Sequence, residues 1–382
     1  MIQRDLHAAI QGMGSALVAF AITLVATAAH GSYRVVAWGD LNYDLALSDP
    51  GAKNGGVAKI SPGSFHSLVL MTSGTVESWG DNSVNQINVP EVVKLNPVVD
   101  IAAGNVHSLA LLPSRTVLAW GSDDYGQCQV PPELGDVVGI AAGATHNLAL
   151  RSDGTVAAWG WDLYGQSRVP AGLNSVIAIA GGMRHSLALR RDGTVVAWGD
   201  AAHGEVSVPL DLTNVVAIAA GGYHSLALKS DGSVAFWGSY GLAQCGLPSG
   251  LSNVVAIATG DQHSLALKKD GSLVVWGFDT AGQCTIPSGL TNIVAIAARG
   301  KHSMALVAEP VPEIPELRID LSGSTVMLSW PISTCPVVLQ QNPGLESSNW
   351  RALNVTPQVL GVRNTVELPA TGSMFFRLFR QE

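Results

Sequence analysis

The sequence predicts an all-β protein: a seven-bladed β-propeller closed by its N- and C-terminal strands, followed by a small β-sandwich-like module. A histidine followed by Ser or Asn and an apolar run occurs at His66, His107, His146, His185, His224, His263 and His302. A Trp-Gly pair occurs at Trp38, Trp79, Trp120, Trp159, Trp198, Trp237 and Trp276. Each of the first six histidines has its tryptophan 13 residues later, but His302 has no Trp-Gly pair after it and Trp38 has no such histidine before it.

This offset between the two motifs indicates a closed ring. An open solenoid needs polar caps at its ends and gains nothing from splitting a repeat, whereas a ring can pair its first strand with its last ones. The repeat occupies residues 31–308 with a period of 39 residues, or 41 in the first steps, and this length is typical of one four-stranded blade.

Residues 214–248 illustrate one repeat. An apolar strand leads through a short turn into a second strand that begins at His224. The Asp-Gly pair at 231–232 predicts a tight hairpin, because these residues readily adopt the positive φ that such turns need. The third strand ends in the Trp-Gly pair at 237–238, and a polar loop leads to a short segment closed by Pro248, which is tolerated on a sheet edge.

Successive strands of a blade reverse direction, so the sequence assigns each loop to a face of the disc. The turns before the histidines and the loops after Trp-Gly are expected on one face, which we call the variable face because its residues differ between repeats. The Asp-Gly turns, which are nearly identical between repeats, are expected on the opposite face.

The segments A-A-G-x-x-H-S-L-A-L, D-G-T/S-V-x-x-W-G and G-Q-x-x-V-P resemble the repeat of regulator of chromosome condensation propellers. The short repeats are most similar to bacterial members of that family, including the propeller-type β-lactamase inhibitory protein. The resemblance implies protein recognition through loops on one face. Guanine nucleotide exchange, the activity of the eukaryotic namesake, is the least expected function because this chain has an export-like N-terminus and no basic tail. Two departures, the missing G-Q-x-x-V-P segment in residues 40–62 and Arg299 in place of a glycine, predict an irregular closing region.

Composition and charge argue against nucleic acid as a partner. Only 13% of the residues are charged, the net charge is −8, and no run of Lys and Arg occurs. These features are the reverse of a phosphate-binding footprint.

The N-terminal 29 residues are typical of a secretory signal peptide. Residues 14–29 carry no charge, Arg4 precedes them, and Ala26 and Ala28 satisfy an A-x-A cleavage rule. We therefore expect an extracellular, periplasmic or cell-surface protein. An uncleaved N-terminal anchor is the alternative, and only then is a membrane a partner.

The four cysteines predict free thiols. Cys128, Cys245 and Cys284 share one repeat position, and equivalent sites on adjacent packed sheets are about 10 Å apart, beyond the Cα separation of about 7 Å that a disulfide allows. Cys335 stands alone in the last module.

The repeated polar residues indicate structure rather than catalysis. A blade spacing of about 10 Å cannot bring the seven histidines to one metal ion, so we expect them to form structural hydrogen bonds and the seven tryptophans to pack between blades. The aspartates after Trp-Gly are ordinary turn residues, although paired carboxylates can also perform acid–base chemistry or bind Ca²⁺. No catalytic or calcium-loop motif is present, so we expect no enzyme activity and no cofactor or metal.

The variable face supplies the candidate binding residues. The position before each histidine carries a different chemistry in every repeat, and aromatic residues follow several Trp-Gly pairs. Exposed aromatic and Arg side chains are enriched in protein-binding hot spots. The predicted partner-binding residues are Phe65, Trp161, Arg184, Tyr223, Tyr240, Phe278 and Lys301. Tyr43, Tyr125 and Tyr164 share one register five residues after a tryptophan and are expected to be structural.

Residues 309–316 are predicted to form a Pro-rich linker. Apolar and polar residues alternate in segments of residues 317–382, which predicts the strands of a small β-sandwich. This module is similar to the C-terminal modules of many exported bacterial proteins. The function expected is noncatalytic binding of a protein or surface partner by an exported propeller. Two alternatives are inhibition of a secreted β-lactamase-like enzyme and binding or cleavage of an extracellular glycan.

Overall fold

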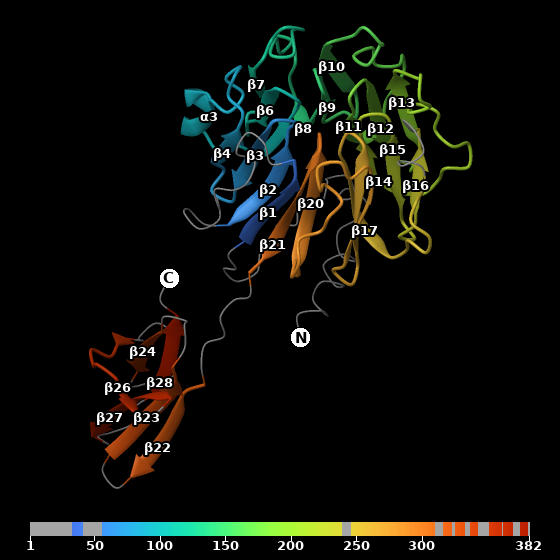
Figure 1. Ribbon diagram of the computed structural model, residues 1–382. Helices are drawn as coiled ribbons and strands as arrows, with labels where there is room; N and C mark the ends of the chain where they lie inside the picture. The colour runs from blue at the N-terminus through green and yellow to red at the C-terminus, as the bar shows by residue number, and fades with distance from the viewer. Residues whose placement is uncertain are drawn as a thin grey trace. The chain divides into compact units, whose positions relative to one another are not determined.

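The computed structural model describes residues 33–40, 56–238, 246–309, 316–322, 325–332, 337–342, 351–360, 362–369 and 375–380. The chain divides into two compact units, of which the first ends at Glu309 and the second begins at Pro310 (Figure 1). The predicted signal segment, residues 1–29, lies outside the described residues, as does most of the predicted linker.

The described residues of the first unit form seven three-stranded antiparallel sheets and one short helix, α3 (Glu91–Leu95). The sheets are β2 (Val57–Pro62), β3 (His66–Met71) and β4 (Val76–Gly80); β5 (Asp100–Ala103), β6 (His107–Leu111) and β7 (Val117–Gly121); β8 (Val137–Ala142), β9 (His146–Arg151) and β10 (Val156–Gly160); β11 (Val176–Gly181), β12 (His185–Arg190) and β13 (Val195–Gly199); β14 (Val215–Ala220), β15 (Ser225–Lys229) and β16 (Val234–Trp237); β17 (Val254–Thr259), β18 (His263–Lys268) and β19 (Leu273–Gly277); and β20 (Ile293–Arg299), β21 (His302–Ala308) and β1 (Tyr33–Gly39).

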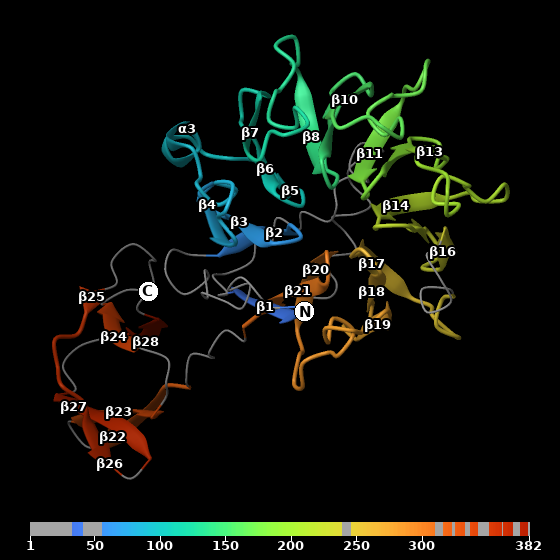
Figure 2. The same cartoon turned by 45° about the horizontal axis from the view of Figure 1, so that its top comes forward.

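The first strands of successive sheets contact one another around a ring. β2 contacts β5, β5 contacts β8, and the series continues through β11, β14 and β17 to β20, which contacts β2 again. Figure 2 shows these strands around the centre, with β4, β7, β10, β13 and β16 farther out. The predicted β-propeller is therefore confirmed.

The ring is closed by β1, as the offset of the motifs predicts. β1 pairs with β21 along its whole length, from Tyr33 opposite Ala308 to Gly39 opposite His302. The N-terminal strand thus completes the sheet that the last two strands of the repeat region begin.

Neighbouring sheets are held together by apolar side chains from facing strands. Leu148 of β9 and Ala188 of β12, for example, are fully buried in one cluster with Trp198 of β13. Complete burial of a leucine side chain is worth about 1.5–3 kcal/mol, so the ring is stabilised mainly at these contacts between sheets.

The expectation of four strands in each blade is wrong for the described residues. The described segments after Trp-Gly pairs form turns, because side chains of the same loop take their backbone N–H groups. Asp123 Oδ1 accepts from the N–H of Cys128 at 2.8 Å, and Gln127 Oε1 accepts from that of Tyr125 at 2.8 Å. Donors satisfied in this way are not available to a sheet ladder.

The described residues of the second unit form two sheets that share one core. One consists of β22 (Arg318–Ser322), β23 (Thr325–Pro331), β27 (Arg363–Pro369) and β26 (Gln358–Leu360), and the other of β25 (Arg351–Ala352), β24 (Val337–Asn342) and β28 (Phe375–Arg380). Leu328 and Trp330 of the first sheet cluster with Leu339 and Leu378 of the second. Two sheets over one apolar core agree with the predicted sandwich.

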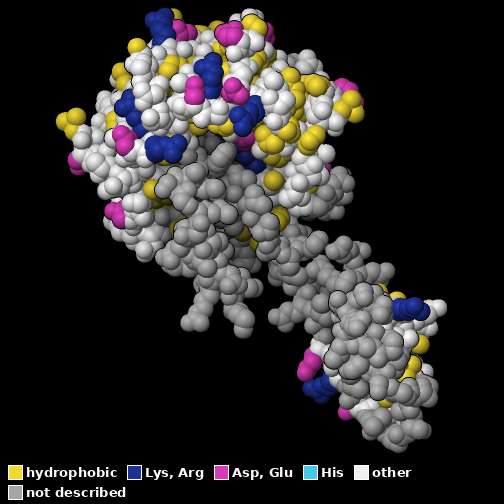
Figure 3. All heavy atoms as spheres, turned by 180° about the vertical axis from the view of Figure 1, so that it is seen from behind, with side chains coloured by type: hydrophobic (Ala, Val, Ile, Leu, Met, Phe, Trp, Pro, Cys, Tyr) yellow, Lys and Arg dark blue, Asp and Glu magenta, His cyan; other side chains and the backbone are white. Residues whose placement is uncertain are grey.

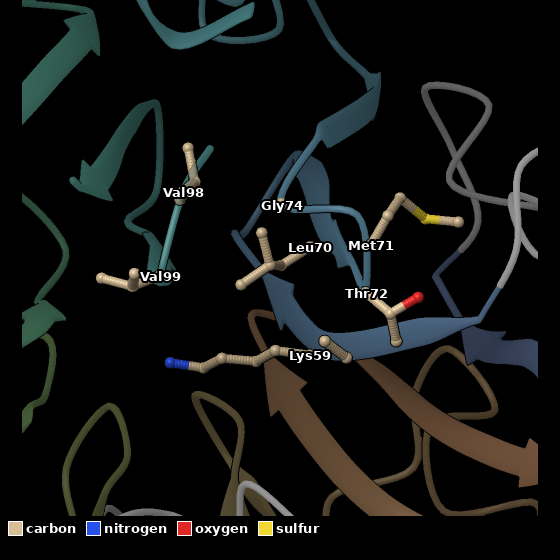
Figure 4. A pocket seen from close by; sticks show the side chains of 8 residues that line it. Lys59, Leu70, Met71, Thr72, Gly74, Val98 and Val99 are labelled. Carbon is tan, nitrogen blue, oxygen red and sulfur yellow. The ribbon is translucent and has the colours of Figure 1, made fainter. Parts of the chain in front are cut away.

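A pocket of about 220 Å³ lies between β2, β3 and the segment before β5 (Figure 4). Leu70, Val98 and Val99 make it apolar, and Lys59, its one charged lining residue, pairs with Asp100. It lies beside the turn at Gly74, on the face opposite the predicted binding residues. Among the described residues, no helix is long and apolar enough to cross a membrane.

Candidate binding face

The two kinds of loop on the variable face are joined by the backbone. In six of the described sheets, the carbonyl before the histidine accepts the N–H of the second residue after the tryptophan; Thr145 O accepts from Trp161 N at 2.9 Å, and Gln262 O accepts from Phe278 N at 3.0 Å. The intervening glycine makes this approach possible, because Gly199 has a φ of +111° and an added Cβ would overlap the carbonyl of Arg184. The predicted assignment of these loops to one face is confirmed.

Six histidines connect each sheet to the next, which confirms their structural role. Their Nε2 atoms lie 2.7–3.0 Å from Ser108, Asn147, Ser186, Ser225, Ser264 and Ser303. Ser225, for example, donates its hydroxyl proton to the carbonyl of Glu205 at 2.9 Å, so its oxygen must accept from His185 Nε2–H. Trp237 Nε1 donates to the same carbonyl at 2.8 Å. Burial lowers the pKa of His185 to about 3, so the ring stays neutral.

The seventh histidine lacks this bond, because Arg299 replaces the glycine. A Cβ at Gly143 would overlap the ring of His146, and the same holds at the equivalent glycines. The ring nitrogens of His302 therefore have no hydrogen-bond partner within the described part of the chain, and the Ser67 hydroxyl donates to Met304 Sδ at 3.7 Å. The irregularity predicted at Arg299 thus changes the side-chain hydrogen bonds, while residues 41–55 of the predicted closing region lie outside the described residues.

Arg299 instead reaches across the ring. It is the last residue of β20, and its Nη1 donates to the carbonyls of Ala142 at 3.2 Å and Gly181 at 3.0 Å, at the ends of β8 and β11. Only 8% of the residue is exposed, so its guanidinium occupies the interior of the ring.

An aromatic ridge spans three loops of the variable face. We define it as Tyr125 after β7, Trp161 and Tyr164 after β10, and Arg184 before β12. The ring of Trp161 lies 5.4 Å from Tyr125 at an interplanar angle of 44° and 5.4 Å from Tyr164 at 86°. The Arg184 guanidinium lies 4.7 Å from the centre of the Tyr164 ring and 3.8 Å from the Asp200 carboxylate.

The structure brings only some of the predicted residues together. Trp161 and Arg184 are joined through Tyr164, whereas Tyr223 packs against His203, with ring centres 5.0 Å apart. The remaining predicted residues are exposed or half-buried on other loops, apart from one outside the described residues; they are Phe65, Phe278, Lys301 and the undescribed Tyr240.

Tyr125 departs from the structural role expected for its register. It is 52% exposed and covers one edge of Trp161. Tyr125 and Tyr164 share one repeat position. The sequence signal for a binding role of Tyr125 is Trp161, which follows the Trp-Gly pair of the next repeat. Leu163, beside the ridge, is 70% exposed, and the sequence did not predict it as a binding residue.

The loop aspartates act as turn residues. Asp162 Oδ1 accepts from the N–H of Ser167 at 3.1 Å, and its Oδ2 accepts from Arg168 Nε at 2.7 Å. Within the described ranges, no group of three or more His, Cys, Asp or Glu side chains is placed to hold a metal ion.

Cys128 and Cys284 are free, half-buried thiols, as predicted, and Cys245 and Cys335 lie outside the described residues. Burial raises the pKa of Cys128 to about 12 and that of Cys284 to about 11. Neither thiol is therefore a thiolate at neutral pH.

The family model of the regulator of chromosome condensation (RCC1) repeat matches six segments, residues 57–86, 98–127, 137–166, 176–205, 215–239 and 254–283. The first unit is thus a β-propeller in which six segments match the RCC1 repeat. Comparison with curated proteins finds no match.

Solved structures with similar folds come from several eukaryotes. Prp20p of Saccharomyces cerevisiae has 22% identity and a TM-score of 0.61, covering 73% of this chain and 92% of its own. Human WBSCR16 has 20% identity and a TM-score of 0.59, covering 72% and 99%. The ectodomain of the Arabidopsis thaliana receptor kinase ACR4 has 24% identity and a TM-score of 0.53, covering 64% and 90%. At these identities the likeness establishes the fold.

Proposed function

We propose that this chain is an exported, noncatalytic propeller that binds a protein partner through the aromatic ridge and the neighbouring loops. The observation that carries the proposal is the ridge, which places three aromatic rings and an arginine side by side on loops of the variable face. Aromatic and Arg side chains supply most of the energy in protein interfaces.

The ridge is also fixed before a partner arrives. The backbone N–H groups of Tyr125 and Tyr164 donate to the buried side chains of Gln127 and Gln166 at 2.8 and 2.9 Å. Side chains on loops that are already ordered lose less entropy on binding, which favours affinity.

A protein partner suits this geometry better than a glycan or nucleic acid does. Rings inclined at 44° and 86° present edges and corners, whereas sugar rings stack on flat aromatic faces. Acidic and basic side chains are interspersed on the side of the first unit seen in Figure 3, and the chain carries a net charge of −8. Neither feature favours a polyphosphate.

The comparisons support protein binding by this type of propeller. The yeast Prp20p structure is described together with its binding to Gsp1p and histones, and the ACR4 structure is of an ectodomain. In a narrower form of the proposal, the partner is a secreted β-lactamase-like enzyme whose protruding loop contacts Phe65, Trp161, Tyr223, Tyr240 and Phe278.

The test compares partner capture by the wild-type chain and by Trp161→Ala. Immobilised full-length protein is exposed to secreted and cell-surface proteins and to purified β-lactamase, and the Kd of each captured protein is measured. We expect Trp161→Ala to raise Kd at least about tenfold, because removal of a central aromatic residue abolishes a hot spot.

The matched control is Val99→Ala, which removes an apolar side chain that is 52% exposed near the opposite face. It should leave Kd unchanged. Equal affinity of Trp161→Ala and wild type, with both folded by circular dichroism, would exclude the ridge as the binding site. Export is tested separately by N-terminal sequencing of the mature protein, and an intact cytoplasmic chain would contradict it.

A further inference from the structure

One described repeat has an acid where four others have an amide. Seven residues after the Trp-Gly tryptophan, the described repeats carry Gln86, Gln127, Gln166, Glu205 and Gln283, all of them buried. In each case a side-chain oxygen accepts the backbone N–H of the residue two positions earlier; Glu205 Oε2 accepts from His203 at 2.8 Å. Glu205 therefore performs the acceptor half of the glutamine's role.

In two repeats the donor half of that role has a defined acceptor. Gln86 Nε2 donates to Asp81 Oδ2 at 2.8 Å, and Gln127 Nε2 donates to Ser122 Oγ at 3.1 Å. Asp81 and Ser122 both stand two residues after the tryptophan of their repeat. The equivalent residue in the repeat of Glu205 is Asp200, so two acidic side chains occupy the places of a donor and an acceptor.

Glu205 lacks that donor when it is ionised. Its Oε1 is buried and has no hydrogen-bond partner in the part of the chain that the structure describes. Glu205 is 1% exposed and Asp200 is 8% exposed, so water cannot readily satisfy either carboxylate. A proton on Oε1 would supply the missing donor and reproduce the bond that Gln86 makes with Asp81.

We propose that Glu205 and Asp200 form a carboxyl–carboxylate pair that holds one proton and positions Arg184 of the aromatic ridge. Asp200 is the link, because its Oδ2 lies 3.8 Å from Arg184 Nη1 and its Oδ1 accepts the N–H of Ala202 at 3.0 Å. Glu205 is thus a positioning residue for the binding face. This inference concerns the regulation of the proposed binding function and rests on it only for its biological consequence.

The charged surroundings favour the protonated form. Burial raises the pKa of Glu205 and the charge of Asp200 raises it further, whereas backbone N–H groups and His203 lower it. The neighbouring strands β15 and β16 contribute Ser225 and Trp237, which are neutral and bond to the Glu205 main-chain carbonyl. Arg184 is the cation on the far side of Asp200.

Ionisation of Glu205 would change what Arg184 faces. With one proton shared, a single negative charge holds the guanidinium between Asp200 and the Tyr164 ring, 4.7 Å from its centre. With both groups ionised, two carboxylates compete for the same guanidinium and draw it away from the ring. Partner affinity through the ridge should therefore fall as the pH rises through the pKa of Glu205.

The proton is tested without any partner. The ¹³C shift of the Glu205 carboxyl carbon is followed by NMR from pH 3 to 8 in the wild-type protein and in Asp200→Asn. We expect a pKa above the ordinary value in wild type and a lower one in Asp200→Asn, whose amide can donate to an ionised Glu205. An ordinary pKa in wild type, or an equal pKa in both proteins, would overturn the proposal.

The melting temperatures of two variants give a second test. One variant changes Glu205, and the other places an acid at the same position of another repeat. Because folding raises the pKa of Glu205, wild type loses stability relative to Glu205→Gln as pH rises above the unfolded value of about 4.3. Above the folded-state pKa of Glu205, the melting temperature of Glu205→Gln should exceed that of wild type by about 2–3 °C for each pKa unit of the shift. Gln86→Glu, which places a new acid opposite Asp81, should acquire the same dependence; pH-independent differences for both variants would contradict it.

The consequence for binding is tested last, with a partner captured as described above. Its Kd at pH 5 and pH 7.5 is compared for wild type and Glu205→Gln. We expect a higher Kd at pH 7.5 only for wild type, and an equal pH dependence in both proteins would exclude regulation by Glu205. If no partner depends on Trp161, the proposed function fails while the NMR result for the proton stands on its own.

Discussion

The polar side chains of the repeat are satisfied by residues that are distant in sequence but adjacent in the ring. His185 donates to Ser225, 40 residues later, and Ser225 and Trp237 both donate to the carbonyl of Glu205. A buried donor that loses its acceptor costs about 1–3 kcal/mol, so these chains strongly favour correct docking of neighbouring sheets. Arg299 shows the same principle, since its carbonyl acceptors come from the far side of the ring.

At this scale we predict that Cys128 resists alkylation in the folded protein. Burial, with a contribution from Asp123, raises the pKa of its thiol to about 12, so little thiolate exists at pH 8. Site-resolved mass spectrometry after iodoacetamide treatment measures the rate for each cysteine. Alkylation of Cys128 in the folded protein as fast as in urea would contradict the structure.

Five inner strands, β8, β11, β14, β17 and β20, begin after a residue in the left-handed conformation. The equivalent residues have φ between +54° and +57°; they are Asp136, Ser175, Asn214, Asn253 and Asn292. Left-handed backbone costs most L-residues about 1–2 kcal/mol, whereas Asn adopts it more readily because its short polar side chain bonds locally. Three repeats have Asn at this position, whereas the repeat that contains Ser175 has serine.

We therefore predict that Ser175→Asn stabilises the propeller by about 0.5–1 kcal/mol. The free energy of unfolding in urea measures the change. Asn214→Ser is the reciprocal control and should destabilise by a similar amount. The reasoning about this turn would be wrong if Ser175→Asn were neutral or destabilising.

The repeat pattern predicts a fourth strand after Trp-Gly, but the described segments at this position are turns. The N–H groups of these segments are occupied by Asp and Gln side chains of the same loop. Those local bonds compete successfully with a ladder because they form without a partner strand. They also fix the backbone at Tyr125 and Tyr164, so the same competition that removes a strand helps to build the aromatic ridge.

At the scale of the whole molecule, the buried histidines make the ring sensitive to acid. Burial lowers the pKa of His146 and His185 to about 3 and that of His224 to about 4, while the unfolded chain titrates near 6.5. Between these values the unfolded state binds more protons, so stability falls as the pH falls below about 6.5. The raised pKa of Glu205 has the opposite effect, because its contribution to folding stability increases as the pH falls.

We predict a melting temperature that falls steeply from pH 6.5 to pH 4.5. Differential scanning calorimetry at constant ionic strength measures it, and His185→Gln should fall less steeply because one titrating group is removed. A melting temperature that is constant over this interval would contradict neutral, buried histidines.

The sequence by itself determined the ring, its closure by the N-terminal strand, the face of each loop and the structural role of the histidines. All of these follow from periodicity, because a repeated residue meets the same neighbours in every blade. Only the tertiary structure decided the reach of Arg299, the assembly of the aromatic ridge and the missing donor at Glu205. These depend on contacts between unlike residues of different repeats, such as Tyr125 against Trp161, and no period in the sequence encodes such contacts.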